Sequence, residues 1–158
     1  MKIDLLGIRK SYNMNPAEFA SLIGLKRAFY LNYEKREELP SKYVYKLWKH
    51  LKNFPLPDDF FYFTSFTLQV NMKYHHMTQS EAAKMFNIAG QSTLSAYLQE
   101  NIPMYEKKEE FLKFDPFIVP FEVTNPSQKK TRELTDLIPK GNFVISEKKL
   151  KYRKSKAE

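Results

Sequence analysis

Apolar residues recur at helical spacing through the first third of the chain, and turn residues between them predict four short helices. Asn15 is the expected N-cap of the second helix, and Pro16 stands at its first position, where a helix accepts proline. Gly24 is expected to end that helix, because glycine tolerates the left-handed backbone of a sharp stop. The four expected helices span about residues 3–12, 16–23, 26–34 and 41–51.

The third of these helices follows directly after the turn, and its two faces differ in chemistry. Tyr30 and Tyr33 lie at i and i+3, so both can face inward. The outward positions are Lys26, Arg27, Ala28 and Asn32. A positive, amide-bearing face of this kind suits phosphates and base edges. The pattern therefore predicts a helix-turn-helix centred on residues 22–34.

The residues in this order resemble the Cro/cI-type (XRE) helix-turn-helix family over roughly residues 3–62. The matching segments are Ile8-Arg-Lys, Glu18-Phe-Ala-x-Leu-Ile-Gly-Leu, Asn32-Tyr-Glu34, Leu39-Pro-Ser and Asn53-Phe-Pro-Leu. In that family the third helix enters the major groove. The resemblance implies base-facing positions at Arg27, Ala28 and Asn32, and phosphate contacts at Asn15, Lys26, Lys35, Arg36 and Lys42. It also implies an ion pair between Arg9 and Glu34 that braces the first helix against the third.

Two residues depart from the family pattern. Pro16 stands where the family usually has a glutamine that helps to position the DNA backbone. Phe29 is bulky where a small polar residue is common, and we include it among the candidate DNA contacts because it lies on the same helix.

The chain also resembles itself. A displacement of 63 residues superposes helix-periodic positions of the first part on a second set. The matched pairs include Glu18 with Glu81, Ala20 with Ala83, Leu31 with Leu94, Leu39 with Ile102, and Pro40 with Pro103. Such agreement indicates an internal duplication. Within the turn, the match is best with one extra residue at Ala89-Gly90, which superposes Tyr33 on Tyr97.

The second copy adds its own candidate DNA contacts. These are Thr78, Gln79, Gln91, Ser92 and Thr93. Residues 104–114 leave two alternatives open. They can continue the helical repeat, with Phe111 and Phe114 matching Trp48 and Leu51. They can also form a hairpin wing that turns at Lys107-Lys108, which would add these two lysines to the contacts and resemble excisionase-like domains.

The predicted fold is mainly α, with two tandem helix-turn-helix units that form an internal pseudo-dimer and a small β element in the C-terminal part. The expected domains are residues 1–62, 63–125 and 126–158, the last with a basic tail. Residues 117–123 and 141–146 are strand candidates that can pair with each other.

Two further features have a structural and a functional interpretation. The aromatic run at residues 60–66 is either a base-stacking platform or core between the copies, and core is favoured because no Lys or Arg is interleaved. His75-His76 has no cysteine and no suitably spaced carboxylate pair nearby, so a cap or a surface role is favoured over a metal site.

Charge locates the expected partner. The net charge is +8, but residues 1–57 carry 11 Lys and Arg against 5 Asp and Glu, residues 58–127 carry 5 against 9, and residues 128–158 carry 10 against 4. An anionic partner is therefore expected at the first segment and the tail. No cysteine, phosphate loop, catalytic constellation or membrane-spanning run is present, so we expect no enzyme, no cofactor, no metal, no membrane and a cytoplasmic location.

The sequence thus predicts a sequence-specific double-stranded DNA-binding protein. It would act as a transcriptional regulator or a DNA-transfer accessory protein of a mobile element, as a monomeric pseudo-dimer or a homodimer. The tandem arrangement is similar to small helix-turn-helix accessory or regulatory proteins of Gram-positive conjugative plasmids or phages. The alternative is a protein-interaction module, such as an antirepressor or inhibitor, built on the same scaffold.

Overall fold

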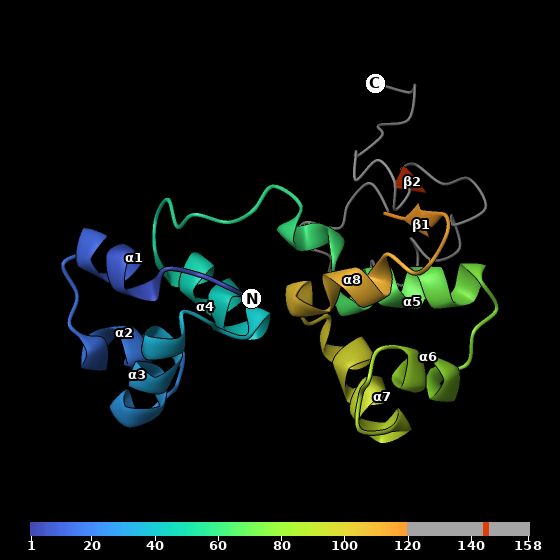
Figure 1. The fold of residues 1–158 in the computed structure, drawn as a ribbon, viewed down its shortest axis with the longest axis horizontal. Coiled ribbons are helices and arrows are strands. Elements are labelled where there is room, and N and C mark those ends of the chain that lie inside the picture. The colour runs from blue at the N-terminus through green and yellow to red at the C-terminus, as the bar shows by residue number, and fades with distance from the viewer. Residues whose placement is uncertain (120–143, 146–158) are drawn as a thin grey trace. The chain divides into compact units, whose positions relative to one another are not determined.

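The computed structural model describes residues 1–119 and 144–145, and the described chain is mainly helical (Figure 1). It divides into two compact units, Met1–Pro57 and Asp58–Glu158. The helices of the first unit run from blue to cyan in Figure 1, and those of the second run from green to orange.

The first unit contains the four helices that the apolar pattern predicts. They are α1 (Leu5–Ser11), α2 (Pro16–Leu22), α3 (Arg27–Arg36) and α4 (Ser41–His50). The Asn15 side chain caps α2 by accepting a hydrogen bond from the Glu18 amide at 2.8 Å. Gly24 has a φ of 71°, which is the left-handed conformation expected at the end of α2. Leu5, Phe19 and Val44 have no exposed surface and bring α1, α2 and α4 into one core.

The predicted ion pair between α1 and α3 is confirmed. Arg9 donates from Nε to Oε2 of Glu34 and from Nη2 to Oε1, both at 3.0 Å, and from Nη1 to the carbonyl oxygen of Met14 at 3.0 Å. Both side chains are nearly buried, with 12% and 11% of their surface exposed. A two-bond geometry fixes the orientation of the two helices as well as their distance.

The ion pair shifts the protonation of its neighbourhood. The hydrogen bond from Arg9 holds the pKa of Glu34 below its usual value, although burial acts in the opposite direction. Burial raises the pKa of the Tyr30 hydroxyl, and the Glu34 carboxylate adds to that effect. Glu34 is therefore charged and Tyr30 neutral over the ordinary pH range.

The described part of the second unit is again helical. It contains η1 (Phe60–Tyr62), α5 (Ser65–Tyr74), α6 (Gln79–Met85), α7 (Gln91–Glu100), η2 (Tyr105–Lys107) and α8 (Lys108–Phe111). The two strand candidates pair with each other as short antiparallel strands, β1 (Phe117–Ile118) and β2 (Val144–Ile145), with Phe117 opposite Ile145. Val119 is described but does not belong to β1, and the rest of both predicted strands lies outside the described residues.

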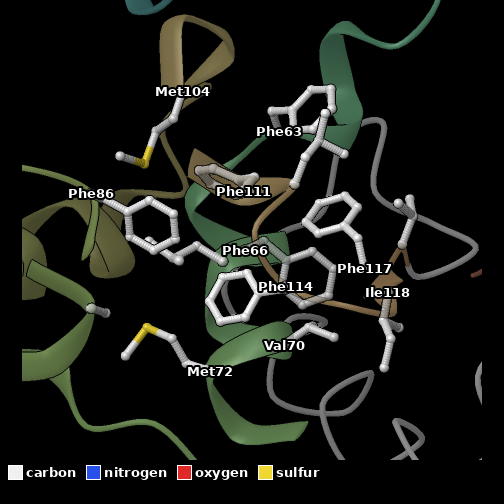
Figure 2. Packing of buried hydrophobic residues seen from close by; sticks show 14 of the residues in the cluster. Phe63, Phe66, Val70, Met72, Phe86, Met104, Phe111, Phe114, Phe117 and Ile118 are labelled. Atoms are coloured by element: carbon white, nitrogen blue, oxygen red, sulfur yellow. The ribbon is translucent and has the colours of Figure 1, made fainter. Parts of the chain in front are cut away.

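Buried residues of the aromatic run at residues 60–66 belong to the core of the second unit, whereas the sequence predicts core between the copies. Phe60 and Phe66 are fully buried and Phe63 is 1% exposed. The Phe63 ring stacks on Phe117 of β1 with centroids 5.5 Å apart and meets Phe111 of α8 edge to face at 5.8 Å. Figure 2 shows these side chains converging from elements far apart in the sequence. Phe60, Phe63 and Phe66 therefore offer no free ring face for base stacking, whereas Phe61 and Tyr62 of the same run are partly buried.

A buried asparagine attaches β1 to α5. Asn71 has no exposed surface, and its Oδ1 accepts from the Ile118 amide at 2.8 Å. Its Nδ2 donates to the carbonyl oxygens of Ile118 and Thr67 at 2.9 and 2.8 Å. A buried polar group is tolerated when its hydrogen bonds are made, and this one also satisfies the backbone of the strand.

The proposed wing at Lys107-Lys108 is wrong. Both residues are helical, in η2 and α8, which excludes a hairpin turn there. The helical alternative holds only for residues 105–111, because α8 has four residues against ten in α4 and Phe114 lies beyond it. Phe111 is fully buried and Phe114 is 3% exposed, so the apolar periodicity of the segment serves the core. Lys108 is held inward by Asp59, with Nζ to Oδ2 at 2.6 Å.

The backbone of the second unit repeats that of the first. Three left-handed residues of the first unit, Asn13, Gly24 and Glu37, have counterparts in the second at His76, Asn87 and Asn101, whereas a fourth, Asn53, has none among the described residues. Asn13 and His76 are 63 residues apart, as are Gly24 and Asn87, whereas Glu37 and Asn101 are 64 residues apart. The Ile88 amide donates to the carbonyl oxygen of Ala83, as the Leu25 amide does to that of Ala20, so Ile88 and Leu25 are equivalent. The extra residue therefore lies between Ile88 and the start of α7. This is the turn at Ala89-Gly90 to which the sequence assigns it.

A short antiparallel bridge closes each unit and corrects one part of that alignment. The Leu39 amide bonds to the carbonyl oxygen of Met1 at 2.9 Å, and the Met104 amide bonds to that of Phe63 at 2.6 Å. The structural counterpart of Leu39 is therefore Met104 and not Ile102. The position requires a buried side chain, and Met104 is 3% exposed whereas Ile102 is only partly buried. Pro103 accordingly occupies the place of Glu38 and not that of Pro40.

The positions of Arg9 and Glu34 hold charged side chains in the first unit and apolar side chains in the second. Arg9 and Met72 are equivalent, because each carbonyl oxygen accepts from the amide five residues later. The position of Glu34 in α3 corresponds to Leu98 in α7. Met72 is 5% exposed and Leu98 packs on the same core. Where the first unit has an ion pair, the second unit has two apolar side chains that belong to or pack against one core.

This equivalence predicts a double-mutant result. Arg9→Met or Glu34→Leu alone leaves one unpaired charge nearly buried, and each should cost about 3 kcal/mol of unfolding free energy. The double variant should return to within about 1 kcal/mol of wild type, because replacing both partners by apolar groups is often neutral. Urea titration of the full chain checks this through Trp48, the one tryptophan of the sequence, which lies in α4 of the same unit. Additive losses in the double variant would contradict it.

The ion pair also predicts a pH dependence. The lowered pKa of Glu34 means that its contribution is complete above the pKa of the unfolded side chain, about 4.3, and is lost as the pH falls through the lower folded value. The wild type should therefore lose more stability than the Arg9→Met/Glu34→Leu variant on acidification from pH 6 to about pH 3. Urea midpoints at both ends of that range measure the difference, and equal losses would show that the pair contributes no pH dependence.

Candidate nucleic-acid interface

The inward face of α3 is fully used in packing. Tyr30 has no exposed surface and meets the Phe19 ring of α2 edge to face, with centroids 5.6 Å apart. The ring of Tyr33 packs beside that of Tyr43 in α4, with ring centroids 6.4 Å apart. Glu34 is held by Arg9 from α1. Contacts from three other helices therefore fix the rotation of α3 about its own axis.

The opposite face of α3 carries the side chains that the sequence predicts to face outward. The exposed residues are Lys26, Arg27, Ala28, Phe29, Asn32, Lys35 and Arg36. We call this set the α3 outer face. Its four cations face no free acid within α3, because Arg9 neutralises the one carboxylate of that helix. Lys35 and Arg36 also lie in the last turn, where a cation favours the helix dipole.

Two further candidates of the first unit lie on neighbouring helices. Asn15 uses its carbonyl oxygen to cap α2, which leaves the amide nitrogen as a donor at the start of that helix. Lys42 is exposed in the first turn of α4, with Nζ 5.0 Å from the centre of the Tyr43 ring. Both remain sterically available to an anion.

The sequence interpretation missed two lysines on α4. Lys46 and Lys49 are exposed, and with Lys42 they form a stripe at i, i+4 and i+7. The Lys46 ammonium lies 5.5 Å from the Tyr43 ring centre, and that of Lys49 lies 4.2 Å from Tyr45. Helical spacing alone could have identified this stripe.

The equivalent face of α7 has lost the positive charge. The residues at the positions of Lys26, Arg27, Lys35 and Arg36 are Gly90, Gln91, Gln99 and Glu100. Gln91 and Ser92 are exposed, whereas Thr93 is partly buried. The Gln91 Oε1 accepts from the Ser80 hydroxyl at 3.1 Å, which ties α7 to α6. This face can donate and accept hydrogen bonds but attracts no phosphate.

The remaining candidates of the second unit serve structural contacts. Thr78 caps α6, accepting from the Glu81 amide at 3.2 Å and donating to the Glu81 carboxylate at 2.9 Å. Gln79 is partly buried at the start of α6. Thr78 and Gln79 lie at the helix position equivalent to Asn15 and Pro16.

Lys107 and Lys108, the two lysines of the predicted wing, are both partly buried and do not form a pair of free cations. Lys108 lies over the rings of Tyr105 and Phe63, at 5.2 and 5.6 Å. Burial alone would lower the pKa of Lys108, but the hydrogen bond and charge of Asp59 outweigh it and raise that pKa. Lys108 is thus a charged, internally paired residue, and the wing that made it a candidate DNA contact is not formed.

Two searches for other kinds of site found none in the described residues. No group of three or more His, Cys, Asp or Glu side chains there could hold a metal ion. In the same part of the chain, no helix combines the length and apolar character that crossing a bilayer requires.

Comparison with known proteins adds no further constraint. No family model matches the chain, and no curated protein or solved structure matches it.

The exposure of the α3 outer face predicts that its residues can be changed without loss of the fold. Arg27→Ala, Phe29→Ala and Asn32→Ala should each shift the unfolding free energy by less than about 0.5 kcal/mol, as surface substitutions usually do. Tyr30→Ala, one position along from Phe29, should cost about 3 kcal/mol or more because it leaves a cavity. Urea titration followed by Trp48 fluorescence compares the four. A loss at Phe29 as large as that at Tyr30 would show that the helix is rotated from the position described.

Proposed function

We propose that this chain is a sequence-specific double-stranded DNA-binding protein that inserts α3 into the major groove. The observation that carries the proposal is the α3 outer face, on which cations, an amide and small or apolar groups lie exposed on one side of a helix whose other side is fully packed. A major groove admits one α-helix, and this combination of groups is what base edges and phosphates bind.

The roles of the residues follow from their chemistry. Arg27 is suited to donate two hydrogen bonds to the O6 and N7 atoms of guanine, and Asn32 to pair with N6 and N7 of adenine. Lys26, Lys35 and Arg36 lie at the two ends of α3 and are suited to the phosphates on either side of the groove. Lys42, Lys46 and Lys49 extend the positive surface along α4.

The packing behind α3 supports this role. Recognition of a base edge requires side chains held in a fixed orientation, and sites on rigid elements meet that requirement best. The Arg9–Glu34 pair and the Phe19–Tyr30 contact supply the rigidity. The order of helices and the resemblance to the Cro/cI-type family point to the same use of α3.

We also propose that the two units are copies of one helix-turn-helix motif and that they have diverged. The matching caps, left-handed residues and closing bridges support a common origin. The missing cations of α7 support a division of labour, because non-specific affinity comes mostly from phosphate neutralisation. The first copy then supplies the affinity, in a regulator or a DNA-transfer accessory protein.

A protein-interaction role is the second candidate function, and the neutral face of α7 favours it for the second unit. That face presents amide and hydroxyl groups at Gln91 and Ser92 and an acid at Glu100. A protein partner, including a second copy of this chain, requires no excess of cations. If the whole chain used this mode, it would be the antirepressor-type module.

The test of the main proposal is selection of the full chain on a random double-stranded DNA library at moderate salt, followed by sequencing of the bound pool. One conserved block is expected if only α3 reads bases, and two blocks about one helical turn apart if both copies or a dimer do. The mass of the complex separates the last two cases. Salt-sensitive binding without a motif would reduce the proposal to a non-specific DNA-binding protein, and absence of binding would favour the protein-interaction role.

The division of labour predicts unequal effects at two equivalent positions. Arg27→Ala should weaken binding to the selected site by about tenfold or more and relax the preference at one base pair, because a bidentate contact to guanine is worth roughly 1–3 kcal/mol. Gln91→Ala, the matched change in α7, should alter affinity less than about twofold, since it contacts no phosphate and one base at most. Fluorescence anisotropy on labelled duplexes measures both.

The phosphate contacts predict a separate signature. Lys35→Ala should weaken binding to all sequences alike and reduce the slope of log affinity against log salt by about 0.9. Glu37→Ala, which removes an exposed acid two residues further on, is the control and should leave that slope unchanged or steeper. Equal salt slopes for wild type and Lys35→Ala would exclude Lys35 as a phosphate contact.

A further inference from the structure

Phe29 is an aromatic side chain that the fold does not use. It is 58% exposed, more than Leu6 at 41% or Tyr74 at 42%, which are the other large apolar side chains exposed in residues 1–119. Within the same unit, Phe19 is fully buried and Phe54 is 5% exposed. An isolated apolar side chain on a surface is ordinary, but this one lies on the α3 outer face between groups suited to DNA.

The second unit shows that the backbone does not require an aromatic residue at this position. The third residue of α3 is Phe29, and the third residue of α7 is Thr93. The next residues, Tyr30 and Leu94, are both fully buried, so the two helices are rotated alike. The structural counterpart of Leu94 is therefore Tyr30 and not Leu31, which is only partly buried. The same helix start therefore forms with a small polar side chain, and folding does not account for the phenylalanine.

The neighbours of Phe29 indicate the chemistry of its partner. Lys26 and Asn32 lie three residues before and after it and share its side of the helix. The same helix carries exposed cations at both of its ends and no free acid, which disfavours an apolar protein surface and favours a polyanion. In a DNA major groove, the apolar group available to such a ring is the C5-methyl group of thymine.

We propose that Phe29 determines sequence specificity by packing against the C5-methyl group of one or two thymines beside the bases read by Arg27 and Asn32. This inference rests on the proposed function and narrows it to sites with thymine at defined positions. The contact is apolar and needs no hydrogen bond, so it distinguishes thymine from uracil, which pairs identically but lacks the methyl group.

The experiment substitutes deoxyuridine for each thymine of the selected duplex, one at a time, and measures affinity for wild type, Phe29→Ala and Phe29→Thr. At one or two positions wild type should lose about fourfold per methyl, the value expected for burying one such group. Phe29→Ala should bind the thymine duplex at least fourfold more weakly and be indifferent to deoxyuridine at those positions. Phe29→Thr, which copies the second unit, should behave similarly.

Leu6→Ala is the matched control, since it removes an exposed apolar side chain from α1. It should leave affinity and the deoxyuridine profile unchanged. Binding by Phe29→Ala equal to wild type, equal deoxyuridine losses in both proteins, or a selected site without thymine would overturn the inference while the DNA-binding function stands. A change in the sedimentation mass of the free protein on Phe29→Ala would assign the ring to a contact between chains instead. Absence of DNA binding by every variant would overturn the function and the inference together.

Discussion

The rotation of α3 about its axis is the constraint on which the rest of the first unit depends. Successive side chains of this ten-residue helix lie about 100° apart around its axis, so a rotation of that size would bring exposed side chains into the packed positions. Tyr30 against Phe19 fixes one side of the helix. The two hydrogen bonds from Arg9 to Glu34 fix the helix at a second position. Hydrogen bonds depend on direction, which apolar contacts do not, so this pair restrains rotation more strictly.

The ion pair contributes more to the orientation of the helices than to the stability of the fold. A nearly buried pair loses much of its Coulomb gain to desolvation, and the second unit holds the same helices together with Met72 and Leu98. Both solutions yield a helix that begins after a left-handed residue and buries its fourth position. The charged version holds Glu34 away from the α3 outer face, so that face carries cations and no acid. The apolar version occurs in the unit whose equivalent face carries no cation.

The comparison of the two units separates what the fold needs from what the surface offers. Caps, left-handed residues, closing bridges and buried positions are shared, and they are the features that determine a backbone. Lys26, Arg27, Phe29, Lys35 and Arg36 have no similar counterpart in α7. The second unit thus acts as an internal control, and residues that differ where the backbone matches are those for which a role other than folding is required.

The sequence by itself determined the local features. Gly24, Asn15 and the apolar spacing act within a few residues, so the helices of the first unit and the outward set on α3 followed from pattern alone. The extra residue at Ala89-Gly90 was also visible, because helix periodicity on both sides fixed the register.

Other features depended on contacts that no local pattern encodes. Asp59 lies 49 residues from Lys108, and only their meeting decided that residues 107–108 continue a helix and not a wing. Phe63 stacks on Phe117, and Asn71 bonds to Ile118, across similar separations. Their partners are set by the way distant segments pack into one core, where burial, and not sequence spacing, selects which residues meet.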